Sequence, residues 1–162
     1  NLPVDSYLVG SFQRDTEGHD LKSPKLEKGP DLLADYLEQV KKDNLHVVLA
    51  GWRRQYIIDR LIKSNIPYTY FERPHHETIN ELYQTLDLYP VSSRCEGGPQ
   101  SLIECGLLNI SVISRDIGIA RQVLSASSIN DNLLLATPSV PNVEEWKLPN
   151  GYKRYRDLLQ SL

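Results

Sequence analysis

The sequence lacks methionine altogether, has only two cysteines, and contains no apolar run that approaches the length of a membrane span. A spanning helix needs about 20 consecutive apolar residues, so the sequence predicts no membrane span, and no signal-peptide pattern is visible. Cys95 and Cys105 do not have zinc-ligand spacing and are too few for a disulfide framework. These absences predict reduced thiols and a cytoplasmic protein.

Neither sign of charge dominates, because 18 Lys and Arg face 21 Asp and Glu, for a net charge of -3. This balance excludes a general attraction to nucleic acid or to an anionic membrane, although a local basic cluster can still bind phosphate. The chain has 162 residues, of which 40% are hydrophobic and 24% charged. These values predict a single globular domain over residues 1–162.

Short apolar segments alternate with amphipathic ones along the chain. The apolar segments predict strands at residues 7–12, 45–50, 67–71, 87–91, 110–114 and 132–136. The amphipathic segments predict helices at residues 31–42, 54–64, 77–86, 100–108, 118–124 and 152–162. Residues 13–30 are too polar and turn-rich for an element and predict a long, functional loop. The alternation predicts an α/β fold with a parallel sheet and helices on both faces.

Residues 96–104 are the most informative segment. Glu96 and Glu104 are separated by seven residues that begin with Gly97, Gly98 and Pro99, between a predicted strand and a predicted helix. The glycines let the backbone approach a ligand closely, and the start of a helix favours an anion such as phosphate. Carboxylates on either side of that phosphate can accept hydrogen bonds from sugar hydroxyls. The alternative is an ordinary loop with a solvated glutamate at each end.

This segment resembles the E-x7-E motif of retaining glycosyltransferases with the two-domain GT-B fold, particularly the large family 4 group. Residues 87–99 read DLYPVSSRCEGGP and resemble the family's D-x-x-x-x-P/x-S-R-x-E-G-x-P run. Residues 101–113 read SLIECGLLNISVI and resemble its L-I-E-A-x-A-x-G-x-P-V-V run. Weaker similarity covers nearly all of residues 6–125.

The resemblance implies a Rossmann-like, doubly wound parallel sheet of about six strands, which is one half of a GT-B fold. It implies that the chain is the donor-binding domain of a glycosyltransferase and binds a nucleoside-diphosphate sugar, without a metal or other cofactor. The absence of an initial methionine and the match to one domain only lead us to expect a fragment whose acceptor domain is missing. Such a fragment is expected to bind nucleotide without transferring sugar.

The resemblance also assigns roles to the motif residues. Glu104 is expected to bind the ribose hydroxyls of the nucleotide, which a carboxylate with two acceptor oxygens can do. Glu96 is expected to face the transferred sugar, where it can stabilise developing positive charge. Gly97, Gly98 and Pro99 form the loop around the phosphate and sugar, where the two glycines offer backbone N–H groups.

The loop after the first strand carries the family's Arg and Lys, which hold the donor's diphosphate. Lys28 matches the Lys, and Arg14 is the nearest match to the Arg, although Ser11 stands where the Arg is usual and a long insertion follows. Ser93 and Arg94 match the S-R pair and are secondary candidates. Each of these charged side chains has an alternative interpretation as an ordinary surface charge.

Other polar residues receive an ordinary interpretation. We expect His75 and His76 to form a loop pair without a metal, and Arg73 to lie where the family packs the nucleotide base. The pairs Lys41–Lys42 and Arg53–Arg54 are interpreted as solvated helix charges. Residues 115–121 replace the family's glycine-rich loop and lack its acidic residue, which leaves that part of the sugar or ribose pocket unassigned.

Two other functions remain open at this point. One is another GT-B-like enzyme, such as an epimerase or a phosphorylase, and the other is a non-enzymatic α/β interaction domain with surface glutamates.

Overall fold

The computed structural model describes residues 2–161, without the side chain of residue 154. Its main strands are all parallel: β1 (Tyr7–Ser11), β4 (Leu45–Gly51), β5 (Tyr68–Glu72), β6 (Tyr89–Val91) and β7 (Val112–Ser114). β4 lies between β1 and β5, and β6 pairs with β7. A parallel bridge between Val9 and Leu88 places β6 next to β1, so the strands run in the order β5-β4-β1-β6-β7.

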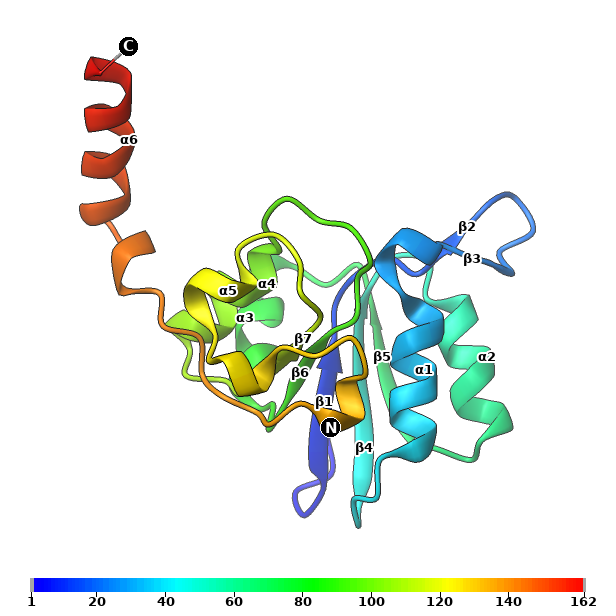
Figure 1. Ribbon diagram of the computed structural model, residues 1–162. Coiled ribbons are helices and arrows are strands. Elements are labelled where there is room, and N and C mark those ends of the chain that lie inside the picture. The colour runs from blue at the N-terminus through cyan, green and yellow to red at the C-terminus, as the bar shows by residue number, and fades with distance from the viewer. Residues whose placement is uncertain (1, 162) are drawn as a thin grey trace.

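Helices cover both faces of this sheet, as Figure 1 shows. α1 (Pro30–Gln39) and α2 (Gln55–Lys63) lie on one face, and α3 (His76–Gln84), α4 (Gln100–Leu107) and α5 (Ala120–Val123) lie on the other. Alternate residues of a strand point to opposite faces. In β4, Val47 and Leu49 therefore pack in the α1–α2 core, whereas Val48 and Ala50 pack in the α3–α4–α5 core. The Rossmann-like fold class predicted from the sequence is confirmed.

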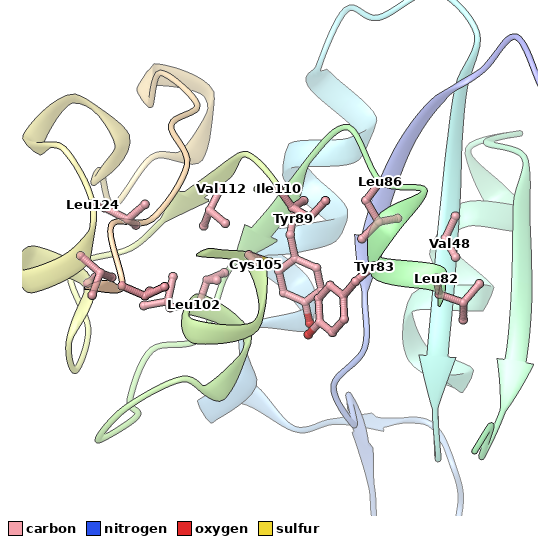
Figure 2. Packing of buried hydrophobic residues seen from close by; sticks show 14 of the residues in the cluster. Val48, Leu82, Tyr83, Leu86, Tyr89, Leu102, Cys105, Ile110, Val112 and Leu124 are labelled. Carbon is pink, nitrogen blue, oxygen red and sulfur yellow. The ribbon is translucent and has the colours of Figure 1, made fainter. Parts of the chain in front are cut away.

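Aromatic rings form part of the α3–α4–α5 core. Figure 2 shows the rings of Tyr83 and Tyr89 lying side by side, with Cys105 beside them. The two ring centroids are 5.4 Å apart, and Phe12, just after β1, lies edge-on 4.7 Å from the Tyr83 ring. Burial raises the pKa of the Cys105 thiol, so this cysteine is an unreactive core residue.

Two predictions about elements are wrong. Residues 132–136 form no sixth strand but a 3-10 helix, η3 (Leu133–Leu135), in which Asn132 Oδ1 accepts a hydrogen bond from Leu134 N. A short apolar run does not by itself distinguish a strand from a helical turn. The 13–30 segment contains a small antiparallel hairpin, β2 (Thr16–Glu17) with β3 (Ser23–Pro24), and a 3-10 helix, η1 (Leu26–Lys28). The Asp20 carboxylate stabilises the hairpin turn by accepting from Lys22 N and Ser23 N.

The last helix of the chain stands apart from the sheet. After η2 (Ala126–Ser128) and η4 (Glu144–Trp146), α6 (Asn150–Gln160) projects away from the body of the molecule (Figure 1). Within residues 2–161, no helix combines the length and the apolar character that crossing a bilayer requires.

Candidate functional site

The strand order reverses between β1 and β6. From β1 the chain continues to β4 and β5 on one side, while β6 and β7 lie on the other side. In open parallel sheets, ligands bind outside the carboxyl ends of the strands at such a reversal. The loops that leave β1 and β6 at this edge contain most of the predicted site residues.

Gly29 allows these two loops to meet. Its φ is +61°, and a Cβ atom at this position would lie 2.0 Å from the carbonyl oxygen of Ser92. Any other residue would force the loops apart. The contact continues where Arg94 N donates to Glu27 O over 2.8 Å. The predicted Lys28-Gly29 pair therefore lies directly against the loop that follows β6.

Lys28, Ser93 and Glu96 form a polar cluster at the meeting point of the loops. Lys28 Nζ lies 2.8 Å from Glu96 Oε1, in an ion pair whose side chains are 28% and 17% exposed. Ser93 is buried, and its Oγ donates to the same Glu96 oxygen over 2.6 Å. The partial exposure of the pair means that an anionic ligand can replace Glu96 on the Lys28 ammonium group.

Gln13 supports this cluster and was missed in the sequence analysis. Its Nε2 donates to Lys28 O over 2.8 Å, and its Oε1 lies 3.2 Å from Ser93 Oγ. The single Ser93 hydroxyl proton can bond either Glu96 or Gln13, so the hydroxyl can change partner when a ligand enters. Gln13 lies two residues after the end of β1, at the carboxyl edge of the sheet. This position is the sequence feature that could have identified it as a site residue.

Glu104 lines a separate hollow of about 190 Å³ between α3 and α4. The remaining lining residues are His76, Ile79, Asn80, Tyr83, Leu107 and Leu108. Burial, reinforced by the nearby Tyr89 and Glu104, raises the pKa of Tyr83 well above its ordinary value. The phenol therefore keeps its proton, and it lines the same hollow as the Glu104 carboxylate.

The Glu104 hollow and the Lys28 cluster are two sub-sites. Lys28 is not among the residues that line the hollow. The two are connected through Phe12, whose ring packs on Tyr83, and through Gln13, which follows Phe12 and contacts the Lys28 cluster. Both sub-sites thus border the segment that leaves β1.

Gly97, Gly98 and Pro99 form the loop between the cluster and α4, in which the two glycines are exposed. A Cβ atom at Gly97 would meet nothing within 4 Å, so this stretch of backbone is open to a ligand. Pro99 is buried, and its carbonyl accepts from Leu102 N as α4 begins. Behind this loop, Gly118 has a φ of +48° and approaches Gly97 so closely that a Cβ would lie 2.6 Å from its carbonyl oxygen. Residues 115–121, which replace the family's glycine-rich loop, therefore pack directly against the loop formed by Gly97, Gly98 and Pro99.

Arg94 and Arg14 lie outside the Lys28 cluster. Arg94 Nη1 and Nη2 each donate to one oxygen of the Asp31 carboxylate. This ion pair lowers the pKa of Asp31 and fastens the start of α1 to the loop after β6. Arg14 Nε donates to Thr16 O, and its guanidinium lies 5.4 Å from the centre of the Trp52 ring. Among the described contacts, none joins Arg14 to Lys28.

The interpretation of Arg54 as a solvated charge is wrong. Its side chain is fully buried, with Nε 2.5 Å from Asp15 Oδ2, Nη1 2.8 Å from Ala50 O and Nη2 2.8 Å from Ser11 Oγ. A second bond from Nη1 reaches Ser11 O. Arg54 therefore binds the ends of β1 and β4 together beneath the loop that holds Gln13 and Arg14.

The two histidines begin α3, His75 as its N-terminal cap residue and His76 as its first residue. In the part of the chain that the structure describes, no three His, Cys, Asp or Glu side chains gather in a group that could hold a metal ion.

Comparisons with known proteins agree with this architecture. The family model described as "Glycosyl transferases group 1" matches residues 22–146, which include the Lys28 cluster, the motif loop and Glu104. No curated protein matches the chain.

Several solved structures share the fold. Anabaena HepE in complex with UDP and glucose superposes with a TM-score of 0.71 at 15% identity, over 98% of this chain and 49% of that chain. The lipopolysaccharide outer core galactosyltransferase WaaB gives 0.66 at 12% identity, over 95% and 48% of the two chains. The catalytic domain of the Helicobacter pylori cholesterol-α-glucosyltransferase gives 0.63 at 17% identity, over 93% and 91%. The chain thus spans about half the length of HepE.

Proposed function

The chain belongs to the glycosyl transferases group 1 family, and we propose that it binds the nucleoside-diphosphate sugar donor of a glycosyltransferase. The observation that carries this proposal is the meeting of Lys28, Ser93 and Glu96 where the strand order reverses. Lys28 and Glu96 are 68 residues apart in the sequence, yet their charged atoms are 2.8 Å apart beside a glycine loop. An ion pair with a purely structural role would not need the open Gly97-Gly98 backbone beside it.

The cluster suits the diphosphate end of the donor. The Lys28 ammonium is a compact cation that can move from Glu96 to a phosphate oxygen. The Gly97 and Gly98 amides and the start of α4 add donors and a favourable dipole for the same anion. Glu96, once released from Lys28, has an oxygen free to accept from a sugar hydroxyl.

The hollow between α3 and α4 suits the nucleoside end. Glu104 presents its carboxylate beside a Tyr83 hydroxyl that stays protonated. Two adjacent ribose hydroxyls match the two oxygens of one carboxylate. Ile79, Leu107 and Leu108 give the hollow an apolar wall against which a ribose or base can pack.

In this proposal, sugar transfer proceeds without a metal and with retention at the anomeric carbon. The bond from the anomeric carbon to the diphosphate oxygen breaks, and the leaving group carries away the electron pair. Lys28 stabilises the developing negative charge, and Arg14 joins it if its side chain leaves Trp52. Glu96 stabilises positive charge on the sugar while the acceptor oxygen attacks from the side of the leaving group, and the acceptor's proton passes to the departing phosphate oxygen.

The acceptor is proposed to bind to a partner domain. This domain would correspond to the part of HepE that the present chain does not match. The isolated chain is then expected to bind the nucleotide and not to transfer sugar. Measurable transfer from a UDP-sugar or GDP-sugar to any supplied acceptor by the 162-residue chain would contradict this expectation.

Calorimetric titration with UDP and GDP tests the donor site. We expect one of the two to bind, and we expect Glu104→Gln and Lys28→Ala each to weaken that binding roughly tenfold, since each removes a charge-assisted hydrogen bond. Glu81→Gln on α3 and Lys63→Ala on α2 are matched controls at exposed positions and should leave the affinity unchanged. Unaltered affinity in both site variants would place the nucleotide elsewhere, and no binding of either nucleotide would refute the proposed site in this chain.

A further inference from the structure

Three arginines gather around one tryptophan at the carboxyl edge of the sheet, away from the Lys28 cluster. The guanidinium carbons of Arg53, Arg73 and Arg14 lie 4.5, 4.7 and 5.4 Å from the centre of the Trp52 ring. They come from three different loops, which follow β4, β5 and β1 respectively. The tertiary fold therefore brings these three cations together.

These cations have no described counter-ion. Within residues 2–161, no salt bridge joins any of the three to a carboxylate. The adjacent acidic residues, Glu17 and Glu72, are exposed and make no described ion pair with them. The nearby Asp15 carboxylate is bound by Arg54. Like charges held close together repel one another, so this arrangement leaves a locally positive surface.

One hydrogen-bond donor of this cluster also lacks a partner within the described part of the chain. Arg53 Nε is buried and has no hydrogen-bond partner among the described residues. One other nitrogen of this guanidinium donates to Gly18 O over 2.9 Å, which holds the side chain in place. A buried, unpartnered donor costs stability unless a ligand or water satisfies it. Trp52 is 41% exposed, so a ligand can reach the cluster.

We propose that Arg53, Arg73 and Trp52 form a second anion site that takes a phosphate-type dianion. Guanidinium groups match the oxygens of phosphate in a two-pronged geometry, and several of them on one ring suit a ligand with more than one negative charge. The site goes beyond the proposed donor site. Among the described contacts, none joins Arg53, Arg73 or Trp52 to Lys28, Ser93 or Glu96, so the two clusters are separate.

Tryptophan fluorescence gives a local readout of this site. The chain has two tryptophans, so Trp146→Phe leaves Trp52 as the only reporter. In that background, we expect inorganic pyrophosphate to change the Trp52 emission saturably. Arg53→Asn and Arg73→Asn should each raise the Kd roughly tenfold, because each removes a charged donor. Asparagine is chosen because both positions have positive φ, +57° and +46°, which Asn tolerates.

Two controls separate this site from the donor site and from general charge effects. Arg121→Asn removes the same charge from an exposed ion pair with Asp116 and should leave the Kd unchanged. Lys28→Ala, which weakens nucleotide binding if the proposed function is right, should also leave it unchanged. Loss of the signal in Lys28→Ala with retention in Arg53→Asn and Arg73→Asn would overturn the proposal, as would the absence of any saturable change.

The source of the phosphate is distinguished in a parallel experiment. Vesicles of phosphatidylcholine containing phosphatidylglycerol replace pyrophosphate in the same fluorescence titration. A vesicle signal that needs Arg53 and Arg73 assigns the site to a lipid phosphate, and a signal with pyrophosphate alone assigns it to a soluble one. The donor proposal predicts that Arg53→Asn binds UDP normally, which calorimetry measures. This experiment therefore shows which of the two proposals has failed if one of them fails.

Discussion

At the scale of single residues, Arg54 shows how a charged side chain can belong to the core of this fold. Its guanidinium is fully buried and is bonded to Asp15, Ser11 and Ala50, so its donors and the Asp15 carboxylate satisfy one another. Such a pair need not stabilise the fold relative to apolar residues, but removing one partner leaves an uncompensated charge. The pair therefore fixes the relative position of the loops after β1 and β4.

We expect Arg54→Met to lower the free energy of unfolding by about 3–5 kcal/mol, because it leaves Asp15 buried without its cation. Adding Asp15→Asn should restore part of the loss, since the buried charge is then gone. Urea denaturation followed by circular dichroism measures both. A loss below about 1 kcal/mol for Arg54→Met would mean that the guanidinium is not the essential partner of Asp15.

At the scale of elements, the junction between η1 and α1 determines how close the two functional loops come. Gly29 has a left-handed backbone, and the space for its Cβ is already filled by the Ser92 carbonyl. Gly29→Ala should therefore cost about 2–4 kcal/mol in unfolding free energy, from backbone strain and overpacking together. It should also weaken nucleotide binding, because Lys28 and Ser93 move apart.

Gly97→Ala provides the matched comparison for that experiment. A Cβ at Gly97 meets nothing within 4 Å, so the same substitution should change the unfolding free energy by less than about 0.5 kcal/mol. Equal losses for the two variants in urea denaturation would contradict the proposed close approach at Gly29.

At the scale of the whole molecule, α6 is a separate appendage. Tyr152, Tyr155, Leu158 and Leu159 are each more than half exposed, and among the described elements α6 contacts chiefly η4. Apolar groups that remain in water contribute little to folding. We therefore expect a chain that ends at residue 149 to retain its unfolding free energy within about 1 kcal/mol and its nucleotide affinity.

A chain that ends at residue 141 is the control for this truncation. It loses Val143, which is 3% exposed in the α3–α4–α5 core, and the bond from Asn142 N to Val123 O. Its unfolding free energy should fall by about 2 kcal/mol or more. Similar stability of the two truncated chains in urea denaturation would show that the tail after η3 is not part of the core.

How far the sequence predicts this protein depends on the range of the interactions involved. Alternating apolar segments identify β1 and β4, and the Gly-Gly-Pro segment correctly marks the start of α4, because these features depend on residues that are near neighbours. The three leucines at 133–135 misled the prediction, because only the cap from Asn132 and the burial of Leu133 distinguish a 3-10 turn from a strand there.

By itself, the sequence determined the α/β class, the order of the main elements and the family, since these depend on local periodicity and on one contiguous motif. Only the tertiary structure decided which charged residues share a site. Lys28 pairs with Glu96 across 68 residues, Arg54 is buried against Asp15 39 residues earlier, and three loops supply the arginines around Trp52. The physical reason is that ion pairing and burial depend on distance in space, which the linear order of residues does not contain.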